Sequence, residues 1–175
     1  MPDPGLQRSR SFGPWPQDDT LHCANTSPQK RGTIFGYLQN AKGRRMTNLE
    51  IIKGIYSGNA DQIAKNLQMA LAPRFEWTEA AGFPYAGTYH SLEEVAKNVF
   101  VRLSTEWIDY RADAESFYDA GNTIIVTGYY RGNYRKTNGR MDASFAHIWT
   151  LENGKIVKYV QNVDTKKVWD AMQGV

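Results

Sequence analysis

The sequence predicts an α+β domain in which a curved, mostly antiparallel sheet packs its concave side against three helices. Two observations carry this prediction. Apolar residues recur at helical spacing in the first half of residues 46–175, whereas the chain after Thr105 alternates as strands separated by short glycine turns. A length of 175 residues suits one domain, or one domain with an appendage.

Residues 1–45 form a basic, proline-rich leader that we expect to be disordered. They hold five of the seven prolines and show neither helical nor strand periodicity, so they bury too little apolar surface to offset the entropy of ordering. Two interpretations stay open: the leader belongs to the native protein, or the natural start is Met46 and the leader is a mis-assigned upstream extension. Residues 46–175 form the predicted folded domain.

Charge and composition exclude several classes of protein. The leader carries seven Lys/Arg against three Asp, and the remaining residues carry 14 basic against 15 acidic side chains, so the body lacks the basic surface of a nucleic-acid-binding protein. No apolar run approaches the roughly 20 residues that cross a bilayer, and we expect a cytoplasmic protein without membrane contact. A single cysteine, Cys23, excludes an internal disulfide framework and any multi-cysteine metal site.

Three helices are predicted from capping residues and helical spacing, over residues 47–58, 59–73 and 91–103. A Thr-Asn pair opens the first helix, because both side chains accept hydrogen bonds from free backbone N–H groups. Pro73 ends the second helix, since proline lacks the N–H that a helix interior needs. Ser91, with a glutamate three residues later, forms a capping box at the start of the third.

The strands are predicted from period-two alternation between turn residues. A short strand and a loop precede the third helix, and four long antiparallel strands and a short C-terminal helix follow it. Gly128 and Gly132 indicate bulges or strong curvature in one long strand. Asn153 and Gly154 form the tip of a hairpin. The expected elements are strand 75–79, loop 80–89, strands 107–118, 123–135, 145–150 and 156–161, and helix 165–172.

This order of elements, with several local strings, resembles the nuclear transport factor 2-like superfamily, and within it the SnoaL-like, ketosteroid-isomerase-related proteins. The resemblance covers about residues 48–170. It implies a cone-shaped, strongly curved sheet of the cystatin-like type, and it specifies fold better than function because this fold hosts many chemistries. The matching strings are Phe75-Glu76-Trp77-Thr78-Glu79, Gly82-Phe83-Pro84-Tyr85-Ala86-Gly87-Thr88-Tyr89, Val126-Thr127-Gly128-Tyr129-Tyr130, Phe145-Ala146-His147-Ile148-Trp149, and Asn153-Gly154-Lys155-Ile156 through Asp164-Thr165.

The resemblance also implies a deep apolar cavity in which a carboxylate or a histidine moves a proton. In ketosteroid isomerase an Asp base works with an oxyanion hole of a tyrosine and a protonated aspartate. Here Glu79 supplies a carboxylate after a one-residue shift, but no aspartate stands near His147, so that oxyanion hole is not carried over. SnoaL-like cyclases imply an aspartate on a late strand beside His and Gln, which His147, Gln161 and Asp164 match in type.

We therefore take His147, Glu79 and Asp164 as candidate catalytic residues. His147 is either a general acid/base or a hydrogen-bonded core histidine. Glu79 shares a strand face with Trp77, and it is either desolvated in the pocket or solvated at the strand end. Asp164 either lines the pocket or caps the C-terminal helix. The expected pocket lining is Trp77, Tyr85, Tyr89, Phe100, Trp107, Tyr130, Phe145, Trp149 and Gln161.

The predicted function is proton-transfer chemistry of the isomerase, cyclase or dehydratase type on a small hydrophobic carbonyl or polycyclic compound. No metal and no organic cofactor is predicted, because no metal-ligand spacing occurs. The alternative is a non-catalytic ligand-binding or dimerisation module on the same fold, and both interpretations predict a homodimer through the sheet's outer face. The stripe Asp109, Arg111, Asp113, Glu115 resembles the Asp-Arg-Asp set of epoxide hydrolases of this fold, or forms an exposed, self-paired face.

Overall fold

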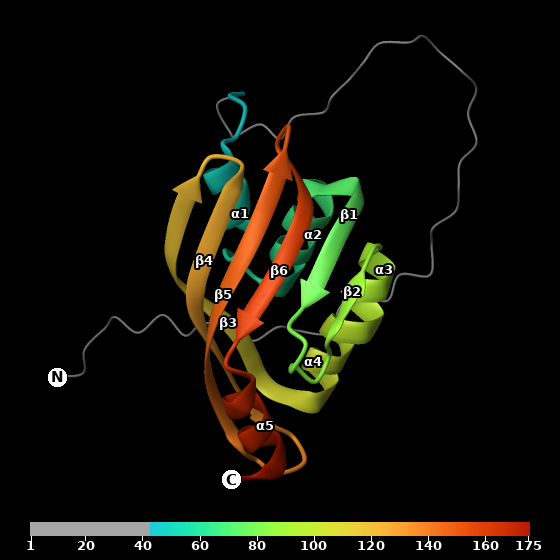
Figure 1. Ribbon diagram of the computed structural model, residues 1–175, viewed down its shortest axis with the longest axis vertical. Helices are drawn as coiled ribbons and strands as arrows, with labels where there is room; N and C mark the ends of the chain where they lie inside the picture. Colours follow the sequence, from blue (N-terminus) through green and yellow to red (C-terminus); the bar gives the residue numbers. More distant parts are fainter. Residues whose placement is uncertain (1–42) are drawn as a thin grey trace, which may run out of the picture.

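The computed structural model describes residues 43–175, which form a six-stranded sheet in the order β2-β1-β6-β5-β4-β3 with helices against one face (Figure 1). The predicted leader, apart from its last three residues, lies outside the described part and stays a prediction. The elements are α1 (Asn48–Ile55), α2 (Ala60–Ala70), β1 (Leu71–Glu79), β2 (Gly87–Tyr89), α3 (Leu92–Val95), the π-helical turn η1 (Ala96–Phe100), α4 (Val101–Glu106), β3 (Trp107–Ala120), β4 (Thr123–Tyr134), β5 (Arg140–Glu152), β6 (Lys155–Val163) and α5 (Thr165–Gln173).

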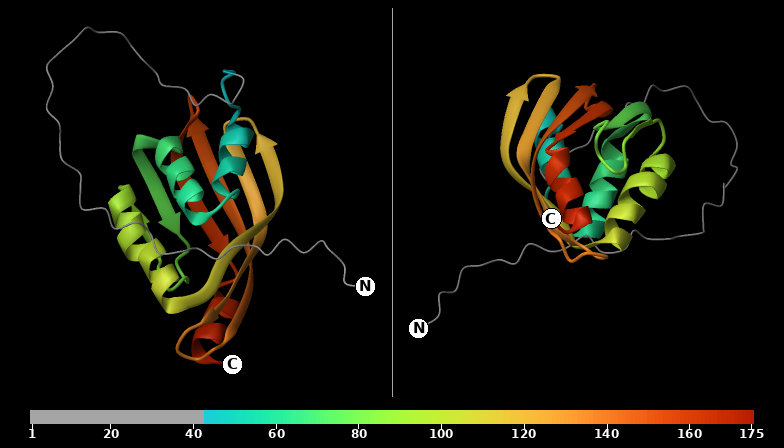
Figure 2. Two further views of the ribbon diagram at one scale, coloured as in Figure 1. Left: turned by 180° about the vertical axis from the view of Figure 1, so that it is seen from behind. Right: turned by 60° about the horizontal axis from the view of Figure 1, so that its bottom comes forward.

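The sheet is mixed, with one parallel pair. Strands β3 to β6 form an antiparallel meander, β1 runs parallel to β6, and β2 pairs antiparallel with β1 at the far edge. Figure 2 shows α1, α2 and the continuous α3–η1–α4 segment on one face of the curved sheet, and α5 beyond its end. The predicted α+β fold, a curved sheet with three helical segments on its concave side, is therefore confirmed.

Side-chain caps set the helix starts as the sequence predicts. Thr47 accepts from the backbone N–H of Glu50, whose side chain accepts in return from the N–H of Thr47, which makes a capping box. Asn59 and Ser91 cap α2 and α3 by accepting from the backbone N–H groups of Gln62 and Glu94, and the Glu94 side chain accepts from the N–H of His90 rather than from that of Ser91. Each helix then presents an apolar face to the sheet, and Ile52 at the centre of α1 is fully buried.

Two predicted boundaries are wrong for identifiable reasons. The second helix ends at Ala70 rather than at Pro73, and Pro73 lies inside β1. The pairing of β1 with β6 shifts register between Leu71 and Glu76, and such an irregular stretch tolerates a proline without an N–H. Residues 87–89, expected as loop, form the short edge strand β2.

The predicted bulges occur, but on the strand that faces the glycines. The β3–β4 register shifts between Ala114 and Ser116, beside Gly128, and again between Ile108 and Arg111, beside Gly132. A Cβ added at Gly128 would collide with the backbone carbonyl of Asp113. The glycines therefore let a bulged β3 approach β4 closely, which curves the sheet around its concave face.

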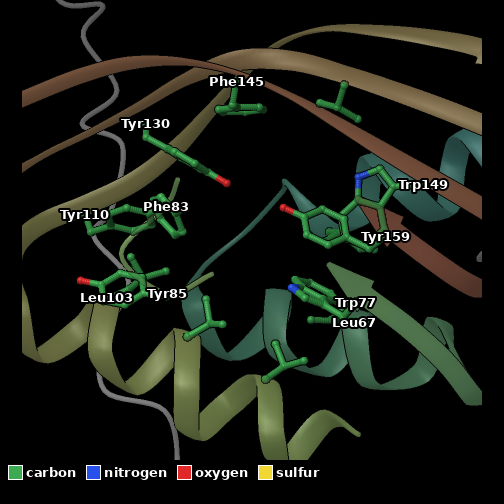
Figure 3. Packing of buried hydrophobic residues seen from close by; sticks show 14 of the residues in the cluster. Leu67, Trp77, Phe83, Tyr85, Leu103, Tyr110, Tyr130, Phe145, Trp149 and Tyr159 are labelled. Carbon is green, nitrogen blue, oxygen red and sulfur yellow. The ribbon is translucent and has the colours of Figure 1, made fainter. Parts of the chain in front are cut away.

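The core between sheet and helices is dominated by aromatic rings. Figure 3 shows Trp77, Trp149 and Tyr159 in contact, with Tyr110 and Tyr130 gathered farther along the same space. The ring centroids of Trp77 and Tyr159 lie 4.0 Å apart, and those of Trp149 and Tyr159 lie 4.4 Å apart. None of the helices within residues 43–175 has the length and apolar character needed to cross a membrane.

Candidate active site

A cavity of about 320 Å³ lies between the concave face of the sheet and the helices. Its size is at the lower end of the range for small-molecule sites, roughly 300–1,000 Å³. Five strands supply its buried polar and aromatic groups: β1, β3, β4, β5 and β6. Helices α1, α2 and α4 with η1 supply apolar side chains, and these are Ile55, Ile63, Ala64, Leu67, Val99, Phe100 and Leu103.

Strand register brings the inward side chains together. Residues directly opposite one another in neighbouring strands share a face of the sheet. His147 on β5 pairs with Gln161 on β6, and Trp149 pairs with Tyr159, which in turn pairs with Trp77 on β1. These side chains line the cavity as a consequence of period-two alternation in three adjacent strands.

Glu79 is the buried acidic residue of the cavity. Its side chain, at the inner end of β1, is only 3% exposed, and the Trp77 indole donates to Oε1 over 2.7 Å. Oε2 is buried and has no hydrogen-bond partner within the described residues. Burial raises the pKa of Glu79 to about 7, and hydrogen bonding from Trp77 and from Gln161 opposes this shift. The carboxyl group therefore exchanges a proton near neutral pH, with one oxygen available to a ligand.

His147 is a neutral imidazole held on both sides. Its Nδ1 lies 2.6 Å from the hydroxyl of Tyr56, and its Nε2 lies 2.5 Å from the hydroxyl of Tyr130. The ring stacks on Phe145, with centroids 4.0 Å apart. Burial lowers the pKa of His147 to about 3. Both ring nitrogens are engaged by tyrosines, so neither is free to contact a ligand.

Gln161 links this network to the end of β1. Its Oε1 accepts the backbone N–H of Ala80 over 3.1 Å, so its Nε2 is the end that donates to Tyr130, at 3.0 Å. The loop after Glu79 is also held by Trp169 of α5, whose indole donates to the carbonyl of Gly82 over 2.8 Å. These contacts fix the backbone that follows Glu79.

The tyrosine hydroxyls of the cavity all titrate above their ordinary range. Burial raises the pKa of Tyr130, and a charge on Glu79 raises it further, while hydrogen bonds from Gln161, Tyr159 and Tyr110 oppose the shift. The phenols are therefore neutral hydrogen-bond donors and acceptors at physiological pH. In Figure 3 the hydroxyls of Tyr130 and Tyr159 point into the same space.

The structure brings together part of the predicted site. Of the twelve residues predicted for the site, seven line the cavity. Lining the cavity are Glu79, His147, Trp77, Phe100, Tyr130, Trp149 and Gln161, whereas Tyr85, Tyr89, Trp107 and Phe145 are not among its lining residues. Tyr85 and Trp107 instead hydrogen-bond to each other, with 2.8 Å between the Trp107 Nε1 and the Tyr85 hydroxyl, and Phe145 lies behind the His147 ring.

Asp164 does not reach the cavity. It is the N-cap of α5, where its carboxylate accepts from the backbone N–H of Lys167 over 3.3 Å. The candidate catalytic role is therefore corrected to the second alternative, helix capping. The chain leaves the sheet immediately after Val163, so the side chain at the next position satisfies the free N–H groups of a helix rather than facing the pocket.

Three tyrosines of the cavity escaped the sequence prediction: Tyr56, Tyr110 and Tyr159. Tyr159 lies two residues before Gln161 on the same strand face, so period-two spacing was a sufficient signal. Tyr56 follows α1 on its apolar face, which indicated only a core position. Tyr110 follows Asp109, whose positive φ of 53° interrupts the alternation of β3. The strand pattern there gave no indication of its inward direction.

The charged stripe on β3 forms ion pairs across neighbouring strands. Asp113 contacts Arg111 at 2.9 Å and Arg131 at 2.7 Å, and Arg131 also contacts Asp142 at 3.1 Å. Arg131 follows the inward-facing Tyr130, so this network lies on the outer face of the sheet. Arg111 and Asp113 also border the cavity, but their charges are paired with each other.

Within residues 43–175, no group of three or more His, Cys, Asp or Glu side chains is placed to hold a metal ion. The buried polar groups that line the cavity are the carboxyl of Glu79, the amide of Gln161 and the imidazole of His147, together with several phenols. This set can accept a proton and can donate hydrogen bonds to an oxygen atom. It suits acid–base chemistry on an organic ligand.

The SnoaL-like domain family matches residues 56–159, which include Glu79, His147 and the cavity tyrosines but end two residues before Gln161. The chain belongs to the SnoaL-like domain family. A solved structure of an NTF2-like protein from Burkholderia thailandensis E264 is 41% identical, with a TM-score of 0.69, and the match covers 73% of this chain and 98% of that chain. No curated protein matches this chain.

Two more distant members of the fold are structurally similar. TerC, crystallized with polyporic acid, is 21% identical with a TM-score of 0.63, over 72% of this chain and 98% of that chain. A putative SnoaL-like polyketide cyclase from Jannaschia sp. CCS1 is 15% identical with a TM-score of 0.61, over 73% of this chain and 92% of that chain. At these identities the likeness shows the fold of this SnoaL-like protein and no more.

The buried acid and base predict opposing pH dependences of stability. Folding favours the protonated form of Glu79, so Glu79 adds to the free energy of unfolding at low pH. This stabilisation is lost as pH rises from 4.5, the ordinary pKa of the group, to about 7. Folding favours the neutral form of His147, so His147 adds to the free energy of unfolding at high pH. This stabilisation is lost as pH falls from 6.5, the ordinary pKa of the group, to about 3. Between pH 4.5 and 6.5 the free energy of unfolding falls with pH because of Glu79 and rises with pH because of His147, so the two effects cancel.

Substitution separates the two contributions. In Glu79→Gln only His147 remains, and the free energy of unfolding, relative to the unsubstituted protein, is expected to rise by about 1.4 kcal/mol per pH unit over this window. In His147→Phe the relative slope has the opposite sign. Urea unfolding at several pH values measures both. Parallel curves for all three proteins would contradict the burial of these charges.

Proposed function

We propose that this SnoaL-like protein catalyses proton transfer on a small hydrophobic carbonyl compound, with Glu79 as the general base. The observation that carries the proposal is the unpaired, buried Oε2 of Glu79 facing an apolar cavity. A carboxyl group with a pKa near 7 is a stronger base than an ordinary carboxylate and is still partly ionised at neutral pH.

The rest of the cavity suits the charge that such a reaction develops. Removal of a proton from the carbon next to a carbonyl places negative charge on the carbonyl oxygen. Neutral phenols from Tyr56 and Tyr130 lie in the same cavity and can donate to that oxygen in a water-poor environment. His147, with both nitrogens engaged, supports these phenols and does not itself receive the proton.

The resulting enolate has three simple fates. Return of the proton to another carbon gives an isomer, attack on a second carbonyl closes a ring, and loss of a neighbouring hydroxyl gives a dehydrated product. The aromatic walls of Trp77, Trp149 and Tyr159 favour a flat, unsaturated ligand. Polyporic acid, with which TerC was crystallized, is a ligand to include in a screen for this reason.

The test begins with flat carbonyl compounds screened by thermal shift against the full chain. Binders are then incubated with the protein in deuterated water, and exchange at the carbon next to the carbonyl is followed by NMR. Exchange above the uncatalysed rate supports the proposal. Tight binders that never exchange protons would instead favour the alternative, a non-catalytic ligand-binding module.

We also propose that the protein forms a homodimer through the outer face of the sheet. Ile125, Ile148 and Val160 are paired in register across β4, β5 and β6 and are half-buried on that face. Light scattering is expected to give twice the chain mass of 19.9 kDa at micromolar concentration. The variant Ile148→Lys should give the single-chain mass, and a monomer in the unsubstituted protein would contradict the proposal.

A further inference from the structure

Trp77 is buried on the same face of β1 as Glu79, two positions before it. Its indole ring packs against three other aromatic rings, with centroid distances of 4.0 Å to Tyr159, 5.5 Å to Trp149 and 5.7 Å to Phe100. Side chains packed in this way sit in single orientations. The direction of the Trp77 N–H is therefore set by the core.

This N–H group is directed at one oxygen of Glu79. It donates to Oε1 over 2.7 Å. An indole N–H can only donate, so the direction of this hydrogen bond does not depend on where any mobile proton lies. A buried indole needs an acceptor for its N–H, and the carboxyl group supplies it. Oε2, by contrast, is buried without a hydrogen-bond partner within residues 43–175.

The backbone around Glu79 is fixed as well. Glu79 pairs with Gly87 of β2 in the sheet, and the N–H of the next residue, Ala80, donates to the side chain of Gln161 over 3.1 Å. The main chain and Oε1 are therefore both held. Rotation of the carboxyl group would break its hydrogen bond to Trp77.

The held oxygen and the unpaired oxygen differ in what they can do. When Glu79 carries a proton, its carboxyl group has one C=O oxygen and one O–H oxygen, and the C=O oxygen is the better acceptor. The indole N–H at Oε1 therefore favours the proton on Oε2. When Glu79 is ionised, the N–H stabilises the negative charge at Oε1, and Oε2 keeps its lone pairs free.

We propose that Trp77 is a positioning residue: its indole N–H holds Oε1 of Glu79, so that Oε2 is the oxygen that takes the proton from the ligand. In that step the C–H bond next to the ligand carbonyl breaks and the proton bonds to Oε2. The electron pair of the C–H bond enters the enolate, so the negative charge moves from Glu79 to the ligand oxygen. This inference rests on the proposed function for its reaction.

The first test is the infrared C=O stretch of protonated Glu79 in the full chain without ligand. Near pH 6 Glu79 is mostly protonated, whereas carboxyl groups with ordinary pKa values are ionised. The difference spectrum between each protein and its Glu79→Gln variant isolates the band. A hydrogen bond to the C=O oxygen lowers its frequency, so the band should move to higher frequency in Trp77→Phe. An unchanged band would place the proton on Oε1 and overturn the proposal.

The second test leaves Trp77 in place and so does not depend on the folding of a Trp77 variant. The chain holds five tryptophans, and one indole N–H signal in the NMR spectrum should move downfield as Glu79 ionises, with a midpoint near pH 7. The movement should be absent in Glu79→Gln. If no indole signal follows the ionisation of Glu79, Trp77 does not act on the base and the proposal is overturned.

The pH profile of proton exchange separates positioning from packing. Trp77→Phe keeps an aromatic ring but has no donor, so ionised Glu79 is less stable in the variant. The pH at which exchange reaches half its maximum should rise by about one to two pH units, as for loss of a hydrogen bond to a charged group. Slower exchange with an unchanged midpoint would mean that Trp77 only packs, against the proposal.

Trp107→Phe is the matched control. Trp107 is 2% exposed and its indole donates to the hydroxyl of Tyr85 over 2.8 Å, but it does not line the cavity. Loss of this donor should leave the midpoint near pH 7. If the unsubstituted protein exchanges no proton, the general-base function is refuted, and the infrared band and the indole signal still decide which oxygen of Glu79 carries the proton.

Discussion

Glu79→Gln is expected to slow proton exchange into a bound carbonyl ligand by about 100-fold or more, with little change in ligand affinity. A positioned general base contributes about 10²–10⁴-fold to such a step, and glutamine cannot accept the proton. Glutamine has nearly the shape of glutamate, and its amide oxygen can still accept from the Trp77 indole. The variant should therefore keep the shape of the cavity and bind the ligand, but it should no longer accept a proton from it.

The matched control is Glu76→Gln, on the same strand. Glu76 is paired with Lys158 at 2.7 Å and is not among the lining residues, so exchange should be unchanged. In the unsubstituted protein the exchange rate should rise with pH through about 7 and then level off, because only ionised Glu79 accepts a proton. If Glu79→Gln exchanges protons as fast as the unsubstituted protein, Glu79 is not the general base.

Trp149→Ala is expected to lower the free energy of unfolding by about 3–5 kcal/mol, the usual cost of removing a large aromatic side chain from a core. Trp149 is 2% exposed and packs between Tyr159 and Trp77, with centroid distances of 4.4 and 5.5 Å. Its removal also leaves the Tyr56 hydroxyl without its 2.9 Å donor. The loss thus reaches both the core and the candidate site.

Chemical denaturation of two variants measures this effect. Trp169→Ala, at a tryptophan that is 42% exposed and donates one hydrogen bond to Gly82, should cost only about 1 kcal/mol. A Trp149→Ala cost no larger than that of Trp169→Ala would show that the cavity wall collapses to fill the space. Because Trp149 lines the cavity, bound ligand should also protect the unsubstituted protein more than the variant.

Local patterns in the sequence predict most of the fold. Capping residues such as Thr47, Asn59 and Ser91 act over three or four positions, and period-two alternation acts within one strand, so both are visible without tertiary structure. The second helix was predicted to end at Pro73 because a proline stops a helix. In the folded protein β1 begins earlier and accommodates that proline where its pairing with β6 is irregular.

The candidate site is less accessible to sequence, because its contacts join distant residues. Tyr56 and His147 are separated by 91 positions, and Gln161 reaches Ala80 across 81. The pattern around His147 predicts an inward-facing imidazole between aromatic rings, but not the tyrosines that engage both its nitrogens. Those tyrosines come from other elements of the fold, so the sequence around His147 could not show that both nitrogens are already engaged.

The sequence by itself determined the α+β class, the hairpin that carries His147, and the strand face shared by Glu79 and Trp77. These follow from short-range periodicity and turn chemistry. Only the tertiary structure decided that Glu79 keeps one oxygen unpaired in an apolar cavity and that Asp164 caps α5. The physical reason is that desolvation and hydrogen-bond pairing depend on which groups surround a side chain in space, and strand register and helix docking set those neighbours.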